Sequence, residues 1–233
     1  MEFIDHLLEF GLTRQEATLY EAMLLHGELT GYEAAKLTGI SRSNTYNALA
    51  GLVEKGAAYI IEGNVTKYTP VEVKDFSANI IRNLTNIRKS LLVSAPKKLV
   101  ECEGYVTIKG RKHALNQLNN MIENVKHRIY LQAKAELLEE VKEELSKIMK
   151  EGKKVVIITD QEEFFLPDAI IYVSDTTIHQ FGVIADSMEV LSGELDNGEE
   201  TACLYSKNSN FVAVFKEMLS NKIRLIILQG GKP

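Results

Sequence analysis

Cysteine is scarce in this sequence. Only Cys102 and Cys203 occur among its 233 residues, far apart and without another cysteine or a histidine at the spacing of metal ligands. We therefore expect no structural zinc site, no other metal and no cofactor. Both thiols are expected to be reduced and partly buried, with redox sensing as the alternative.

Membrane and secretion signals are also missing. No apolar run approaches the roughly eighteen residues that would span a bilayer. The first residues, Met1 to Asp5, include acids rather than the basic start of a secretory signal. We expect a cytoplasmic protein without membrane contact. No glycine-rich loop follows a β-prone run, which argues against a nucleotide-binding fold.

The chain has fewer basic than acidic residues. The formal net charge is −5, and residues 1–70 carry five lysines and arginines against nine aspartates and glutamates. This balance argues against a protein that binds nucleic acid through a general excess of positive charge. A DNA-binding protein of this composition is expected to bind with modest affinity and strong salt dependence.

The most informative segment runs from Ser41 to Gly56. Ser41 can cap the start of a helix, and Gly56 can end one because glycine accepts a left-handed conformation. Between them, helical spacing gathers Thr45, Ala48, Leu49 and Leu52 into one stripe that can pack inward. The opposite face is polar and carries Arg42, Ser43, Asn44, Tyr46 and Asn47.

The flanking segments predict a winged helix-turn-helix. Residues 32–38 form a short helical pattern that ends at Gly39, and three residues then lead into the capped segment. After Gly56, two β-prone runs at 58–61 and 65–69 surround a turn. In such a domain the second helix enters a DNA major groove and the hairpin touches the flanking backbone.

Four segments within residues 1–70 carry a resemblance to a known family, namely Leu12 to Ala17, Gly31 to Ala35, Ile40 to Ser43 and Glu54 to Gly56. With them, residues 1–70 closely resemble the DNA-binding half of the TrmB family of transcriptional regulators. The resemblance implies a homodimeric regulator that binds double-stranded operator DNA. Where the family commonly has basic residues on the recognition helix, this chain has Asn47 and Ala50, so its phosphate contacts are expected to be weaker or elsewhere.

Six residues are candidates for DNA contact. Asparagine suits the edge of adenine, and arginine suits guanine or phosphate. The alternatives are an ordinary exposed helix face, or a winged helix used for protein contact, which the acidic balance suggests. The candidates are Arg42, Ser43, Asn44, Tyr46 and Asn47 on the helix and Lys67 on the wing.

We divide the chain into a DNA-binding domain at 1–70, a connecting segment at 71–101 and an α/β domain at 102–233. Apolar residues recur at threes and fours between Phe76 and Leu92, which predicts a long amphipathic helix that Pro96 ends. This helix could pack on its own domain. We favour pairing with a second copy, because an operator with two-fold symmetry needs a DNA-binding protein with two-fold symmetry.

The third segment alternates β-prone and helical patterns, which indicates a mainly parallel sheet with helices on its faces. The fold class is thus α/β with two domains. We expect helices at 111–125, 135–150 and 209–219 and strands at 104–110, 128–132, 154–159, 169–173, 178–185, 188–192, 201–205 and 223–228.

His179 and Asp186 have the spacing of the first and last residues of the phospholipase D motif, and this segment resembles the degenerate phospholipase-D-like domain of TrmB-type regulators. The motif needs a lysine to hold phosphate, but Phe181 stands at that position. We therefore expect no enzyme activity. The alternative is a phospholipase-D-like hydrolase tethered to nucleic acid.

Gln132, Thr159 and His179 lie at or near predicted strand ends, where open α/β sheets place ligands. They are weak candidates for effector contacts. Sugar sensing is known in the TrmB family, but the sequence leaves open a sugar, another metabolite, a partner protein or no effector. The operator and the choice between activation and repression are equally open.

Overall fold

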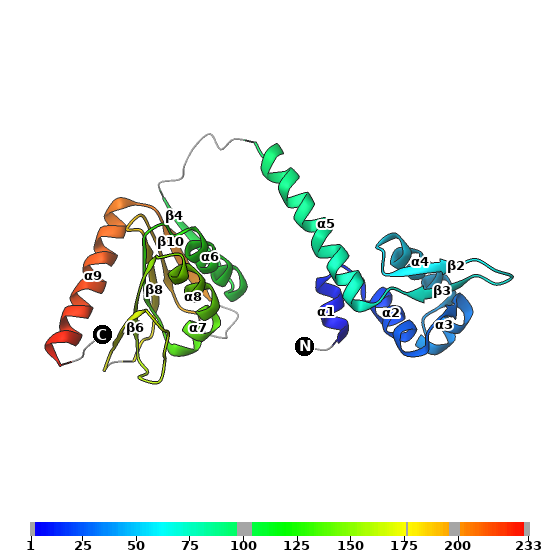
Figure 1. Cartoon of the computed structure of the whole chain (residues 1–233), viewed down its shortest axis with the longest axis horizontal. Helices are drawn as coiled ribbons and strands as arrows, with labels where there is room; N and C mark the ends of the chain where they lie inside the picture. Colours follow the sequence, from blue (N-terminus) through cyan, green and yellow to red (C-terminus); the bar gives the residue numbers. More distant parts are fainter. Residues whose placement is uncertain (1–2, 97–103, 176, 196–200, 231–233) are drawn as a thin grey trace. The chain divides into compact units, whose positions relative to one another are not determined.

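The computed structural model describes residues 3–96, 104–175, 177–195 and 201–230. The chain divides into two compact units, an N-terminal unit at Met1–Lys97 and a C-terminal unit at Lys98–Pro233. Figure 1 shows both units. Cys102 lies outside the described residues, and Cys203 is buried.

Four short helices form the body of the N-terminal unit, and two of them begin with a capping box. The Thr13 side chain accepts from the backbone N–H of Glu16, whose carboxylate accepts from the backbone N–H of Thr13. The spacing of Thr13 and Glu16 in the sequence is that of a capping box and by itself predicts this helix start. Thr30 and Glu33 start the third helix in the same way. The helices are α1 (Phe3–Glu9), α2 (Arg14–His26), α3 (Gly31–Thr38) and α4 (Arg42–Glu54).

The wing is a three-stranded antiparallel sheet. It contains β1 (Leu29–Thr30), β2 (Ala58–Ile61) and β3 (Lys67–Pro70), in the order β1-β3-β2. The sequence predicts the hairpin of β2 and β3, although β3 begins two residues later than expected. It does not predict β1, because two residues are too short for a recognisable alternation.

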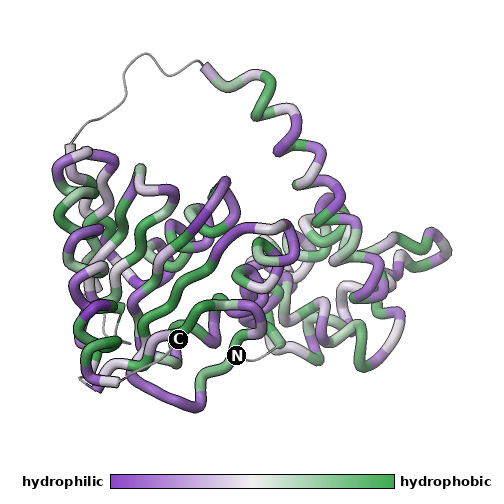
Figure 2. The backbone as a smooth tube through the Cα atoms, turned by 60° about the vertical axis from the view of Figure 1, so that its left-hand side comes forward, coloured by the Kyte–Doolittle hydropathy of each residue, from purple (hydrophilic) through white to green (hydrophobic). Residues whose placement is uncertain are grey.

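Helix α5 (Val73–Ser94) joins this unit through its first turns. Phe76 is buried beside Tyr20, with ring centroids 5.5 Å apart. The Tyr20 hydroxyl donates to the carbonyl of Val71 at 2.6 Å, and burial raises the pKa of Tyr20 to about 12. From Ile81 onward every side chain of α5 is exposed, and hydrophobic and hydrophilic segments alternate along its tube in Figure 2.

The C-terminal unit contains a mixed sheet, so the prediction of a mainly parallel sheet is wrong. Only β5 pairs in parallel with β6, and β6 with β7; the other four pairs are antiparallel. A three-residue turn joins β8 to β9, which is too short for a parallel crossover. In sheet order the strands are β4 (Tyr105–Lys109), β10 (Ala202–Ser206), β9 (Glu189–Gly193), β8 (Phe181–Ala185), β5 (Arg128–Gln132), β6 (Lys154–Thr159) and β7 (Ile170–Val173).

Helices cover both faces of this sheet (Figure 1). On one face lie α6 (Arg111–Asn124), α7 (Ala135–Glu140) and α8 (Lys142–Lys150), which pack over the larger apolar core. On the other face lies α9 (Ser209–Leu228), which packs over a smaller apolar core.

Two helix predictions need correction. The single helix expected at 135–150 is two helices, because the chain leaves helical geometry at the buried Val141. The strand expected at 223–228 is the last part of α9. Its β-branched residues favour a strand by composition, but Ile223 and Ile226 recur at helical spacing with Leu219 and pack on the sheet.

The structure has two further negative features. None of the described helices is long and apolar enough to cross a membrane. Within the same described ranges, no group of three or more His, Cys, Asp and Glu side chains is placed to hold a metal ion.

Candidate nucleic-acid interface

Helix α4 is held by a cap and by one buried stripe. The Ser41 hydroxyl accepts from the backbone N–H of Asn44 at 3.4 Å. The Thr45 hydroxyl donates back to the Ser41 carbonyl at 3.0 Å. The predicted stripe of Thr45, Ala48, Leu49 and Leu52 is buried. Since this stripe faces the core of the unit, the opposite face of the helix points to solvent.

The polar face of α4 lies on the surface of the N-terminal unit. All five residues predicted there are exposed, and Tyr46 keeps 51% of its surface accessible despite its contact with α3. The chain's own described atoms therefore leave this face open to a large ligand such as a DNA duplex. The five residues are Arg42, Ser43, Asn44, Tyr46 and Asn47.

Tyr32 belongs to the same surface, although the sequence did not identify it as a site residue. The guanidinium carbon of Arg42 lies 4.8 Å from the centroid of the exposed Tyr32 ring. This is a cation–π contact, which limits the directions that the Arg42 side chain can take. A usable signal was present, because Tyr32 stands in the first turn of the helix that precedes the capped segment.

Tyr46 packs against the start of α3 at Gly31. A Cβ atom added to Gly31 would lie 2.4 Å from Cε1 of the Tyr46 ring, which is closer than atoms can approach without movement. Glycine therefore permits this close approach. Together with the contact between Arg42 and Tyr32, it ties the polar face of α4 to the first turn of α3.

Two lysines near this surface are engaged within the chain. The Lys55 ammonium donates to Glu16 Oε2 at 2.6 Å and to the carbonyl of Gly11 at 2.8 Å, so it supports the fold. On the wing, the Lys67 ammonium lies 3.3 Å from Glu28 Oε2, and its side chain stays partly exposed. Lys67 is thus available to a phosphate only in competition with a carboxylate.

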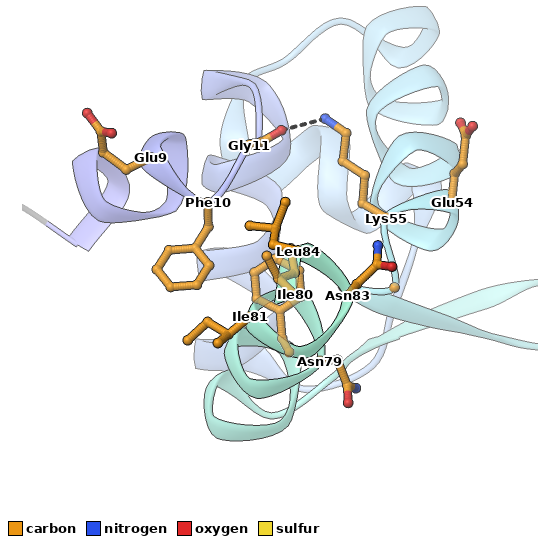
Figure 3. Close-up of a pocket in the computed structure, with 12 residues that line it drawn as sticks. Glu9, Phe10, Gly11, Glu54, Lys55, Asn79, Ile80, Ile81, Asn83 and Leu84 are labelled. Atoms are coloured by element: carbon orange, nitrogen blue, oxygen red, sulfur yellow. Dashed lines mark hydrogen bonds between the residues drawn. The ribbon is translucent and has the colours of Figure 1, made fainter. Parts of the chain in front are cut away.

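A groove of about 810 Å³ lies between the α1–α2 loop, the end of α4 and α5. Figure 3 shows Phe10, Ile80, Ile81 and Leu84 gathered along it, while the carboxylate of Glu54 points away. The sequence predicted an amphipathic helix here but not the groove. A groove needs side chains from three separate segments, and their proximity is not visible in a local pattern.

The structure does not bring the three candidate effector contacts into one cavity. The side-chain amide of Gln132 donates to the carbonyl of Gln180. Gln132 pairs in register with Ile158, and Ile158 packs on the α9 side of the sheet. Thr159 is the next residue and points to the other face, fully buried. His179 is exposed and lines a cavity of about 30 Å³, the volume of a single water molecule.

The residues of the phospholipase-D-like motif lie at opposite ends of β8. His179 precedes the strand and Asp186 follows it, which separates them by about 20 Å. Burial opposes ionisation of Asp186, but the backbone N–H groups of Lys126, Arg128 and His127 donate to its carboxylate and hold its pKa below the usual value. Asp186 therefore secures a turn and is too far from His179 to share a reacting atom.

Two protein families match this chain. Residues 7–74 match the family described as sugar-specific transcriptional regulator TrmB. Residues 104–223, more than half of the chain, match the family described as transcriptional regulator TrmB, EBD N-terminal subdomain.

Three individual relatives are similar to this chain, and the alignments cover between 44% and 85% of the length of each relative. The YrhO protein of Bacillus subtilis is 26% identical over 96% of this chain and 85% of YrhO. The HTH-type sugar sensing transcriptional regulator TrmBL1 of Pyrococcus furiosus is 26% identical over 63% of this chain and 44% of TrmBL1. The DNA-binding HTH-type transcriptional repressor TrmBL2 of Thermococcus kodakarensis is 27% identical over 65% of this chain and 64% of TrmBL2. The matches to the two regulators thus span less than two thirds of either.

Solved structures show a more distant likeness. The structure of TrmBL2, described as an archaeal chromatin protein with a novel mode of DNA binding, aligns with a TM-score of 0.46 at 20% identity, over 94% of this chain and 96% of TrmBL2. Nuc of Salmonella typhimurium, a phospholipase D family member, aligns with a TM-score of 0.41 at 16% identity, over 52% of this chain and 95% of Nuc.

Proposed function

Because this chain belongs to the TrmB family of transcriptional regulators, we propose that it is a sequence-specific DNA-binding regulator that inserts α4 into the major groove of an operator. The observation that carries this proposal is the exposed polar face of α4, held in place by the Ser41 cap and the buried stripe behind it. A helix presented in this way is the reading element of a winged helix-turn-helix.

The side chains on this face have distinct proposed roles. Arg42 contacts guanine or a phosphate, and its stacking on Tyr32 limits its positions before DNA arrives. Asn44 and Asn47 suit the edge of adenine. Ser43 and Tyr46 supply hydroxyl groups for phosphates, and Lys67 adds one contact from the wing.

We propose a homodimer that pairs through α5. Ile80, Leu84, Ile87 and Leu91 recur at spacings of four, three and four, the pattern of a two-stranded coiled coil. Leu84, Ile87 and Leu91 are exposed, and the groove beside Ile80 and Leu84 continues the apolar surface onto Phe10. A second copy that covers this surface would place two α4 helices on the two half-sites of an operator.

We propose that the C-terminal unit regulates and does not catalyse. The buried Phe181 and the separation of His179 from Asp186 disfavour phosphodiester hydrolysis. A sugar, as the name of TrmBL1 suggests, or another metabolite would act by binding one dimer arrangement better than the other. Of the three predicted contacts, His179 is the one we retain, because it is exposed beside a cavity that would have to widen to admit a sugar. Gln132 and Thr159 lie on opposite faces of the sheet and cannot both contact the same ligand.

Selection of bound sequences from random double-stranded DNA tests the main proposal. We expect one enriched two-fold motif, and gel shifts with that motif should show binding that weakens steeply between two salt concentrations. Arg42→Ala should lose about 1 to 3 kcal/mol of binding free energy. Arg14→Ala removes the same charge from α2, outside the helix-turn-helix, and serves as the matched control.

The opposite results would overturn the proposal. A selection without an enriched motif would leave the winged helix as a protein-contact module. Equal affinity and equal sequence preference for Arg42→Ala and the unchanged chain would remove Arg42 from the interface.

A further inference from the structure

Helix α9 has two apolar faces, and the sheet of its own unit covers only one of them. Val212, Leu219 and Ile226 are buried on that sheet. On another side of the helix, Val214 is 64% exposed, Met218 42%, Leu225 59% and Leu228 82%. Four large apolar side chains thus lie on one side of one helix, unlike scattered single exposures.

The exposed residues follow the spacing of a coiled-coil seam. Beginning at the partly buried Phe211, the seam continues at positions 214, 218, 221, 225 and 228, in steps that alternate between three and four. This alternation keeps one stripe facing a partner helix along the whole length of α9, about 30 Å. One polar residue, Asn221, occupies a central position of the seam.

Charge placement indicates the partner and its direction. Glu217 and Arg224 are both exposed and flank the seam on the same side. When a second α9 runs antiparallel with Met218 opposite Asn221, Val214 faces Leu225 and Phe211 faces Leu228. This register also places each Glu217 beside Arg224 of the other copy, so the same ion pair forms twice about one two-fold axis.

In a parallel pair of α9 helices, Glu217 and Arg224 would form weaker contacts. In the parallel register Glu217 would face Lys222 of the other copy, but Lys222 is partly buried and its pKa is lowered by that burial, with Asp160 nearby opposing the shift. Arg224 would face the neutral Gln229. Antiparallel helix dipoles also attract each other.

We infer that α9 is a self-association surface, on which α9 of a second copy of this chain lies antiparallel and is centred between Met218 and Asn221. The contact belongs to the C-terminal unit and is separate from the pairing of α5 proposed above. It would give the regulatory units an interface of their own, whose strength an effector could change.

The experiment uses the full chain with the α5 stripe broken by Leu84→Glu and Leu91→Glu, both at exposed positions. Sedimentation velocity over a concentration series should still show a dimer. Adding Leu225→Glu should abolish it, because the dimer would bury two carboxylates without partners. Lys216→Glu, exposed on another side of α9, is the matched control and should leave the dimer unchanged.

Charge reversal tests the register in the same background. Glu217→Arg and Arg224→Glu should each weaken dimerisation about tenfold, and the double variant should restore it. Far-ultraviolet circular dichroism should show that all variants keep their helix content.

Three results would overturn the inference. The α5-broken chain could be monomeric at every concentration, or its dimer could resist Leu225→Glu, which would place the contact elsewhere. A double charge reversal that does not recover dimerisation would rule out the antiparallel register. None of these results depends on DNA binding or on the α5 pair, so the inference can fail while the proposed function holds.

Discussion

The ammonium group of Lys55 lies 2.6 Å from Oε2 of Glu16 and joins the end of α4 to the start of α2. Glu16 is buried, and the same carboxylate also closes the capping box with Thr13. The helix that carries the candidate DNA-reading face is therefore fixed to the body of its unit at the end opposite the Ser41 cap.

This ion pair predicts a pH-dependent contribution to stability. Burial opposes ionisation of Glu16, but hydrogen bonds from Lys55 and Thr13 outweigh it and hold the pKa of Glu16 below its usual value of 4.5. The stabilisation is therefore complete above pH 4.5 and is lost as the pH falls through the lowered pKa. Lys55→Met should cost about 2 kcal/mol at neutral pH and much less in acid.

Urea unfolding of the N-terminal unit at neutral and at acidic pH measures this difference. Lys36→Met removes an exposed charge from α3 and should change the free energy of unfolding by no more than about 0.5 kcal/mol. An equal loss for Lys55→Met at both pH values would show that Glu16 is not the group responsible.

The packing of Tyr46 on Gly31 predicts coupling between α3 and DNA binding. Gly31→Ala would force the Tyr46 ring aside, since the new Cβ would meet it at 2.4 Å. We expect operator affinity to fall about threefold to tenfold, and gel shifts would measure the fall. Tyr46→Ala and the double variant complete a mutant cycle. If both effects act through the ring, Gly31→Ala adds nothing to Tyr46→Ala; full additivity would contradict this.

The apolar stripe of α5 predicts that charged substitutions within it weaken the dimer. Leu84→Glu with Leu91→Glu should weaken dimerisation at least about tenfold, because each carboxylate would be buried in the pair. Sedimentation velocity measures the dissociation constant. Asn86→Glu adds the same charge on another side of the helix and should have little effect. Affinity for an operator with two half-sites should fall more than affinity for a single half-site; equal losses would argue against α5 as the dimer interface.

Asp186 predicts a stability effect in the C-terminal unit. Its carboxylate accepts from three backbone N–H groups at 2.7 to 3.0 Å, and its backbone is left-handed with φ of 50°. Asp186→Asn tolerates that backbone and isolates the loss of charge. Asp186→Ala should cost about 2 to 3 kcal/mol, and Asp186→Asn less. Thermal unfolding measures both, with the exposed Glu162→Ala as the control. A neutral Asp186→Ala would show that the turn does not need its carboxylate.

Cys203 predicts an unreactive thiol. Burial raises the pKa of Cys203 to about 11, so little thiolate exists near neutral pH. In a Cys102→Ser variant, a disulfide reagent should label Cys203 at least about a hundredfold more slowly in the folded chain than in denaturant. Rapid labelling of the folded chain would revive the redox-sensing alternative.

Local patterns explain why much of the N-terminal unit was predictable. The Thr13 and Glu16 cap, the Ser41 cap and the buried stripe of α4 each depend on residues within two turns of one another. The groove beside α5 was missed because it joins segments that are distant in the sequence. The contact of Arg42 with Tyr32 was missed although the two residues are close in the sequence, because it depends on how α3 and α4 pack across their turn.

In the C-terminal unit, local patterns predicted individual elements but not how they are arranged. Individual strands such as β5 and β6 agree with the predicted ranges, but the direction of the sheet does not, because pairing depends on connections and not on composition. Residues 223–228 have the composition of a strand, and the tertiary core retains them in α9. The proposed effector contacts were chosen by their position at strand ends, and alternation along β6 places Thr159 on the face opposite Gln132.

The sequence by itself determined which segments are helices in the N-terminal unit, which side of α4 is apolar and which residues form its opposite, polar face, since capping and helical periodicity act over a few residues. Only the tertiary structure decided how the strands of the C-terminal unit pair, that Lys55 pairs with Glu16, and that α9 keeps a second apolar face uncovered. Those outcomes depend on which distant segments meet, and burial and pairing across the whole unit select them.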